Sequence, residues 1–182
     1  MKNTKYLNTV NVLICIQLVF AGIVSFLNLY TTIHKLNLVI SIFLILSGFL
    51  SIVFLKFQEK LTFSKKNNIA LAIFAILIGF ILSNEVELNS FQTSFYIGIY
   101  MVLYALLSLD FKIVNFSPKS PKEFTILSFL FIQFIIGSVL VLMPEIVNIN
   151  ENIIFSCCFF INSFSIYQSN TNEINILKYQ ET

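Results

Sequence analysis

Long apolar runs separated by short polar segments make up most of this chain. The clearest run, residues 124–143, holds twenty residues without a charge and is followed by Pro144 and Glu145. At about 1.5 Å of rise per residue it is roughly 30 Å long as a helix, which matches the hydrocarbon thickness of a bilayer. A backbone in lipid must satisfy its own hydrogen bonds, so the pattern predicts a membrane-spanning helix.

Five further runs of this kind predict six membrane-spanning helices within a single integral membrane domain, residues 1–182. The predicted spans are residues 10–30, 36–55, 69–83, 94–109, 124–143 and 153–167. The third, fourth and sixth have only 15 or 16 residues, so flanking polar side chains are expected to extend to the interface, or the bilayer to thin. A signal peptide is the alternative for the first run, although its apolar residues continue past Ala21, where cleavage would occur.

The distribution of lysine predicts how the spans are oriented. Ten of the eleven lysines lie in the N-terminal segment, the loops 56–68 and 110–123, and the C-terminal tail, whereas the opposite links contain only Lys35. Because cytoplasmic loops carry the excess of basic residues, both termini are expected in the cytoplasm. The chain is therefore expected in the cytoplasmic (inner) membrane of a bacterium.

Small residues recur at regular intervals along the chain. One set lies in the first, third and fifth runs, 57 and 58 residues apart: Gly22, Gly79 and Gly137. A second set lies 26 residues further on in each case: Gly48, Ala105 and Ser163. The spacing predicts three tandem helical hairpins, arranged as parallel repeats about an axis along the membrane normal. Small residues let helix backbones approach closely, so packing is their expected role, and contact with a pore or ligand is the alternative.

Three tandem hairpins, a glycine late in each odd-numbered helix and the phrase GSVLVLMPE at residues 137–145 together point to a known family. With these features the chain resembles the acid-resistance membrane protein family named HdeD, over roughly residues 10–168. The first two repeats carry Asn28 and Asn84-Glu85 where the family pattern has proline. The resemblance implies a six-helix inner-membrane protein linked to acid stress, and it carries over no catalytic residues.

Composition agrees with the membrane class and narrows the chemistry. The chain is 57% apolar and 11% charged, whereas about 25% of residues are charged in soluble domains. A net charge of +2, without a basic cluster interleaved with aromatics, gives no reason to expect a nucleic-acid partner. No charged residue lies inside an apolar run, which weighs against a proton-driven transporter or an intramembrane hydrolase. Because no catalytic or metal-binding motif occurs either, we expect no enzyme activity, cofactor or metal.

Three amide side chains are expected inside the membrane: Gln17, Gln133 and Asn162. Gln17 and Gln133 stand at near-equivalent places in the first and third repeats. The amides are expected to form hydrogen bonds between helices, and a polar lining of a shared central cavity is the alternative. Packing is also favoured over a substrate track for a stripe of tyrosines on one face of the fourth run: Tyr96, Tyr100 and Tyr104.

Five ionisable residues lie in the links that would face the outside: His34, Glu85, Glu87, Glu145 and Glu151. Carboxyl groups with an ordinary pKa of about 4.3, and a histidine with a pKa of about 6.5, change charge as the medium becomes acidic. The hypothesis is that these residues sense or buffer external acid. The alternative is that they are ordinary solvated loop residues.

Taken together, the sequence predicts a non-catalytic multipass membrane protein associated with stress. The alternatives are a small transport component, either the substrate-binding subunit of an importer or a passive channel for small solutes. An importer subunit would need a roomy polar pocket open to the outside. The lipid bilayer is the expected partner, and a homo-oligomer or an assembly with other membrane proteins stays open.

Overall fold

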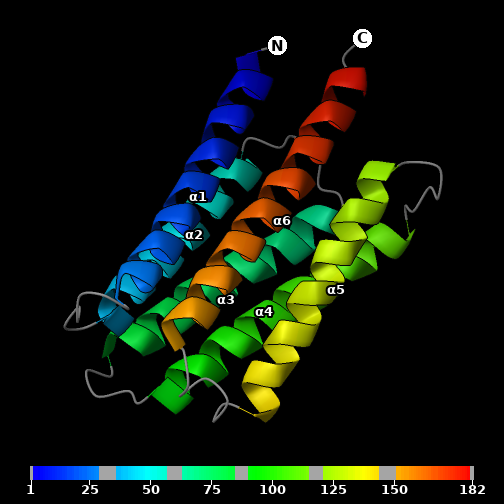
Figure 1. The fold of residues 1–182 in the computed structure, drawn as a ribbon. Coiled ribbons are helices and arrows are strands. Elements are labelled where there is room, and N and C mark those ends of the chain that lie inside the picture. Colours follow the sequence, from blue (N-terminus) through cyan, green and yellow to red (C-terminus); the bar gives the residue numbers. More distant parts are fainter. Residues whose placement is uncertain are drawn as a thin grey trace.

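The chain forms six α-helices in a computed structural model (Figure 1). The structure describes residues 2–28, 36–56, 63–84, 90–114, 121–143 and 151–180, and within them every regular element is a helix. The helices are α1 (Lys2–Leu27), α2 (Leu36–Lys56), α3 (Phe63–Asn84), α4 (Ser90–Val114), α5 (Pro121–Leu142) and α6 (Glu151–Gln180). The predicted all-α architecture is therefore confirmed.

Each predicted apolar run lies largely within one helix, but the helices do not end where the runs end. The helices α3, α4 and α6 have 22, 25 and 30 residues, so they extend into the neighbouring polar segments. An established helix gains one backbone hydrogen bond for each residue added, so it continues through polar residues until a breaker intervenes. In contrast, α1 ends at Leu27, before the predicted end of its run at residue 30.

Four helices are long and apolar enough to cross a membrane, through the residues Tyr6–Leu27, Asn37–Lys56, Phe91–Leu109 and Phe124–Leu142. The apolar part of α3, Asn68–Asn84, is shorter. Large apolar side chains are exposed on several helices, among them Phe20, Phe49, Phe80 and Phe131. Exposed apolar surface on this scale suits contact with lipid tails rather than water. These are helices of a membrane protein, whereas crossing by all six stays a prediction.

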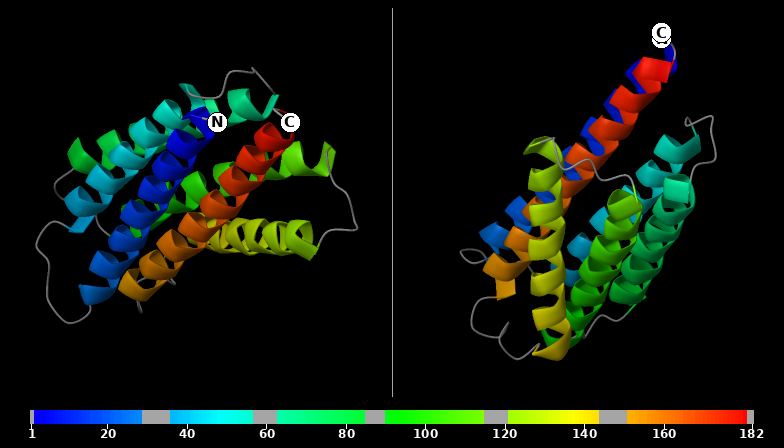
Figure 2. Two further views of the ribbon diagram at one scale, coloured as in Figure 1. Left: turned by 90° about the horizontal axis from the view of Figure 1, so that it is seen from above. Right: turned by 90° about the vertical axis from the view of Figure 1, so that its right-hand side faces the viewer.

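The helices alternate in direction, so both termini lie at the same end of the bundle, which we call the terminal end (Figure 1). The most extensive contacts join α2 to α3, α4 to α5, and α1 to α6. Less extensive contacts join α1 to α2, α3 to α4, and α5 to α6. Seen from above, α6 lies beside α1 (Figure 2). The last helix thus returns to the first and closes a ring of neighbours.

Glycine brings α2 and α3 close together. A Cβ added to Gly48 on α2 would lie 2.6 Å from the carbonyl oxygen of Ala72 on α3. One added to Gly79 on α3 would lie 2.9 Å from the carbonyl oxygen of Ser41 on α2. Real Cβ atoms do not approach backbone oxygen this closely, so side chains at these two positions would push the helices apart.

The contact between α4 and α5 is built in the same way. A Cβ added to Gly98 on α4 would lie 2.9 Å from the carbonyl oxygen of Gly137 on α5. The reverse distance, from a Cβ on Gly137 to the carbonyl oxygen of Gly98, would be 3.0 Å. Here two glycines face each other across the contact, and only the absence of both side chains allows this approach.

Candidate functional site

Three polar side chains from three helices meet in the middle of the bundle, and we call them the amide–tyrosine cluster. The Nε2 of Gln133 on α5 donates a hydrogen bond to Oδ1 of Asn162 on α6, at 3.2 Å. The Nδ2 of Asn162 donates in turn to the hydroxyl of Tyr100 on α4, at 3.3 Å. The three residues are exposed by only 0%, 2% and 5%, so these hydrogen bonds are shielded from solvent.

One acceptor in this cluster has no partner. The Oε1 atom of Gln133 is buried and accepts no hydrogen bond in the part of the chain that the structure describes. Leaving a buried carbonyl oxygen unpaired costs about 1–3 kcal/mol, and buried water is the usual way in which proteins avoid that cost. The cluster therefore has capacity for a further hydrogen-bond donor.

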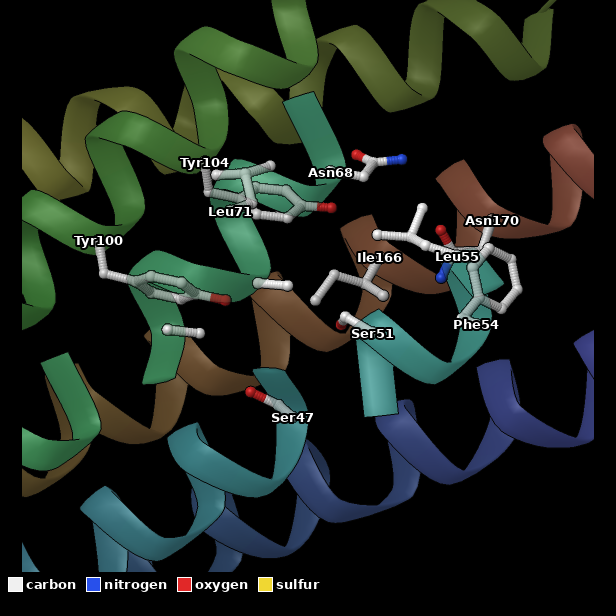
Figure 3. Close-up of a pocket in the computed structure, with 12 residues that line it drawn as sticks. Ser47, Ser51, Phe54, Leu55, Asn68, Leu71, Tyr100, Tyr104, Ile166 and Asn170 are labelled. Carbon is white, nitrogen blue, oxygen red and sulfur yellow. The ribbon is translucent and has the colours of Figure 1, made fainter. Parts of the chain in front are cut away.

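A cavity of about 40 Å³ opens beside the cluster, and we call it the polar cavity (Figure 3). Half of its lining is polar and comes from α2, α3, α4 and α6: Ser47, Ser51, Asn68, Tyr100, Tyr104 and Asn170. The other half is apolar: Phe54, Leu55, Leu71, Ala72, Ala75 and Ile166. The Tyr100 hydroxyl belongs to both the cavity and the cluster, so it connects them.

The polar cavity lies in the half of the bundle next to the terminal end. On α2 its lining extends from Leu55, beside the end of the helix at Lys56, back to Ser47. At 1.5 Å of rise per residue, Ser47 lies about 13 Å in from that helix end. Tyr100 likewise stands in the middle of the apolar span of α4, Phe91–Leu109. The cavity thus leads from one end of the bundle to the middle of its spans.

The predicted amides divide into two separate places. Gln133 and Asn162 are bonded to each other, whereas the Nε2 of Gln17 donates to the carbonyl oxygen of Phe43, at 3.2 Å. Gln17 therefore links α1 to α2 and does not join the cluster. All three amides make interhelical hydrogen bonds, and the structure does not bring Gln17 and Gln133 to one central cavity.

The tyrosine stripe also divides. Tyr100 and Tyr104 are both buried, with ring centroids 6.4 Å apart, and their hydroxyls point from α4 into the polar cavity (Figure 3). Tyr96 is only half-buried and makes an edge contact with the ring of Phe95, at 6.0 Å between centroids. Two members of the predicted stripe thus line a cavity, while the third packs outside it.

The predicted small residues lie at helix contacts, although their neighbours differ in kind. Gly48 and Gly79 face backbone oxygen between α2 and α3, as described above. A Cβ added to Gly22 would instead meet the ring of Phe160 on α6, at 3.0 Å. Ala105 is fully buried in α4. The hydroxyl of Ser163 on α6 donates to the carbonyl oxygen of Cys15 on α1, at 3.0 Å.

Hydrogen bonds run along the whole contact between α1 and α6. Near the terminal end, Nδ2 of Asn170 donates to Oδ1 of the buried Asn11, at 3.0 Å. Towards the other end, three bonds continue the series: Ser163 Oγ to Cys15 O at 3.0 Å, Ser156 Oγ to Gly22 O at 2.6 Å, and Asn28 Nδ2 to Asn152 Oδ1 at 3.0 Å.

Sequence reasoning missed several members of this series, among them Asn11 and Ser156. Asn11 lies inside the first predicted run, so its burial could have been suspected, but it stands near the run's start, where polar residues usually face the interface. Ser156 has a clearer signal, because it follows Ser41 and Gly98 at intervals of 57 and 58 residues, the same intervals that separate the recurring glycines.

The residues predicted to respond to acid lie almost entirely outside the described part of the chain. His34, Glu85, Glu87 and Glu145 are not among the described residues. Glu151 is the first residue of α6, at the end of the bundle opposite the termini, and the structure describes its backbone but not its side chain.

The chemistry that the cluster and the cavity lining support is hydrogen bonding. The side chains of the cluster and of the cavity lining are all uncharged amides, hydroxyls and apolar groups. Among the described residues, no group of three or more His, Cys, Asp or Glu side chains could hold a metal ion. The chain matches no family model, no curated protein and no solved structure at a significant level.

Proposed function

We propose that the chain is a non-catalytic, six-span protein of a bacterial cytoplasmic membrane, with both termini in the cytoplasm. The observation that carries the proposal is the position of the lysines. Every lysine among the described residues belongs to a helix end at the terminal end of the bundle: Lys2, Lys5, Lys56, Lys65, Lys66, Lys112, Lys122 and Lys178. Basic residues are retained on the cytoplasmic side of membrane proteins, which supports this orientation.

The proposal includes three tandem hairpin repeats. The three most extensive helix contacts alternate with less extensive ones around the ring, as a threefold arrangement requires. Small residues at one repeat interval also face the recurring glycines at the same interval, in the pairs Ser41–Gly79, Gly98–Gly137 and Ser156–Gly22. Two independent series with the same spacing, meeting across three contacts, support the repeat.

Reporter fusions test the orientation and the number of spans. Alkaline phosphatase is active only outside the cytoplasm, and green fluorescent protein fluoresces only within it. Fused in turn to each link and to the C-terminus, the two reporters are expected to alternate, with fluorescence at the terminal-end loops and at residue 182. Phosphatase activity at the C-terminus would show that the orientation is the reverse of the proposed one. The same reporter signal on both sides of α3 or of α6 would show that this helix does not cross the membrane.

The role in acid resistance rests on the family resemblance and is tested by survival. Loss of the gene is expected to lower survival after exposure to strong acid, and the wild-type gene to restore it. The narrower acid-sensing proposal predicts that a variant with Gln or Asn at five outer positions restores survival only in part: His34, Glu85, Glu87, Glu145 and Glu151. Full restoration by that variant would exclude acid sensing by these residues.

Passage of very small solutes is the second candidate, because the polar cavity leads from one end of the bundle to the middle of its spans. Passage across the membrane would also require buried apolar residues of the other half, such as Leu44 and Leu82, to separate. A cavity of about 40 Å³ is far below the roughly 300–1,000 Å³ of sites that bind organic ligands. The cavity therefore does not favour the substrate-binding subunit of an importer. Its hydroxyl and amide lining suits water-sized polar molecules, which a channel for small solutes would also have to accommodate.

A further inference from the structure

We propose that the polar cavity is a water-filled half-channel, which leads from the terminal end of the bundle to the amide–tyrosine cluster and stops there. The inference rests on the membrane insertion proposed above, but not on a role in stress. According to this proposal, water occupies the cavity and enters the bundle from the terminal end only.

The size of the cavity selects this occupant. A single water molecule needs about 10–15 Å³ of cavity volume, so about 40 Å³ accommodates about three. None of the twelve lining residues is charged, so no side chain retains an ion there as a resident occupant, although a small cation can still pass through the water to a thiolate. A neutral molecule with hydrogen-bonding capacity fits both the volume and the lining.

The lining also offers water the partners that it needs. Water held inside proteins makes about three hydrogen bonds to groups that would otherwise be unsatisfied. The Ser47 hydroxyl donates to the carbonyl oxygen of Leu44, which leaves its lone pairs available as acceptors. The Tyr100 hydroxyl accepts from Asn162, which leaves its own hydrogen available as a donor.

The cluster gives the water-filled space an inner end. Tyr100 forms the inner wall of the cavity, and the chain of hydrogen bonds continues through Asn162 to Gln133. The unpartnered Oε1 of Gln133 lies at the far end of this chain of hydrogen bonds, beyond the residues that line the cavity. Polar groups so deep in a membrane bundle are costly when dry, and water in the cavity reduces that cost for the Tyr100 hydroxyl, the one cluster group that lines it.

Beyond the cluster the bundle is sealed by apolar side chains. Towards the other end, α2 buries Leu44 and Ile40, and α3 buries Ile78 and Leu82, each exposed by less than a twentieth of its surface. At the terminal end the cavity lining instead mixes two buried apolar residues, Phe54 and Leu55, with two polar residues that are only half-buried, Asn68 and Asn170. Water is therefore admitted from one end and stopped near the middle, which keeps the bundle tight to solute flow at rest.

Cysteine accessibility along one face of α2 tests the half-channel. In a background with Cys15, Cys157 and Cys158 replaced by Ala, single variants Ser51→Cys, Ser47→Cys and Leu44→Cys are made in the full-length protein. The silver ion, which is small and membrane-impermeant, is applied to vesicles of either orientation. Thiols left unmodified are then counted with a fluorescent maleimide after denaturation.

Ser51→Cys and Ser47→Cys are expected to react with silver at least about ten times faster than Leu44→Cys. The reason is that a thiol reacts as its thiolate, which forms in water. Their reaction is expected only when silver is applied to the side that carries the termini. Matched variants on α3, Ala75→Cys inside the cavity and Ile78→Cys beyond it, are expected to show the same contrast. A melting temperature in detergent close to that of the background protein shows that each variant is folded.

Slow reaction of Ser51→Cys and Ser47→Cys in folded protein, equal to that of Leu44→Cys, would overturn the proposal. So would reaction from the side opposite the termini. Reporter fusions locate the termini independently, so a reversed orientation would contradict the proposed topology while leaving the half-channel intact, and the two failures are distinguishable.

Discussion

The contact between α2 and α3 and the contact between α1 and α6 occupy corresponding places in the ring, yet they are held together differently. Between α2 and α3, Gly48 and Gly79 bring the backbones together, and contact is by close packing. Between α1 and α6, hydrogen bonds cross at several levels, from Asn11–Asn170 to Asn28–Asn152. The α4–α5 contact follows the glycine pattern, with Gly98 facing Gly137.

Chain connectivity explains this difference. The helices α2 and α3 follow each other through a short loop, which confines them to each other's vicinity at a small entropic cost. The helices α1 and α6 are at opposite ends of the chain, and no loop joins them or sets their register. Hydrogen bonds can set it, because a slip along the axis would leave several polar groups unpaired in an apolar interior. Interhelical hydrogen bonds thus fix the register of α1 and α6, which no connecting loop sets.

The largest predicted effect is at a glycine that faces backbone. Gly48→Ala puts a Cβ 2.6 Å from the carbonyl oxygen of Ala72, and the backbone can yield only if α2 and α3 separate. We expect a loss of about 1–3 kcal/mol in the free energy of unfolding, measured by denaturation in detergent. Gly22→Ala is the matched control, because its nearest neighbour, the Phe160 ring, can rotate, and alanine favours the helix by up to about 1 kcal/mol. Equal losses in the two variants would contradict the distinction.

An intermediate effect is predicted where hydrogen bonds join α1 to α6. Ser156→Ala and Ser163→Ala each remove one interhelical bond, and each is expected to cost about 0.6–1.7 kcal/mol. Limited proteolysis should show α6 becoming accessible before the other helices. Ser25→Ala is the control, because that hydroxyl donates to Ala21 in its own helix, and it should leave stability almost unchanged. Loss of α2–α3 packing in the Ser156 or Ser163 variants would argue against a local role.

The smallest effect is predicted for Gln17→Leu. The Gln17 amide donates to the carbonyl oxygen of Phe43. That oxygen lies inside α2, so it keeps its hydrogen bond within the helix when the amide is removed. No buried group is left unpaired, so we expect a loss of at most about 0.6 kcal/mol. The same denaturation experiment measures it. A loss as large as that of Gly48→Ala would mean that Gln17 positions α1 against α2 in a way that the single bond does not explain.

The amides show most clearly where sequence reasoning stops. Gln17 and Gln133 occupy near-equivalent positions in two repeats, and their expected role as interhelical bonds agrees with the geometry. Their partners differ, because one meets a backbone oxygen of the next helix and the other meets Asn162. The hydrogen-bond partner of a buried amide depends on which groups the neighbouring helices place at the same depth. The sequence of one helix does not specify which helices become its neighbours.

The sequence by itself determined that this protein is made of apolar helices, because the length and polarity of each run are local properties of about twenty residues. The positions of glycine also indicated where helices pack closely, because a residue without a side chain lets two backbones approach. Only the tertiary structure decided that α6 returns to α1, that Tyr100 joins Asn162, and that a polar cavity ends beside them. Those features depend on groups far apart in the chain meeting at one depth, and that is a property of the assembled bundle.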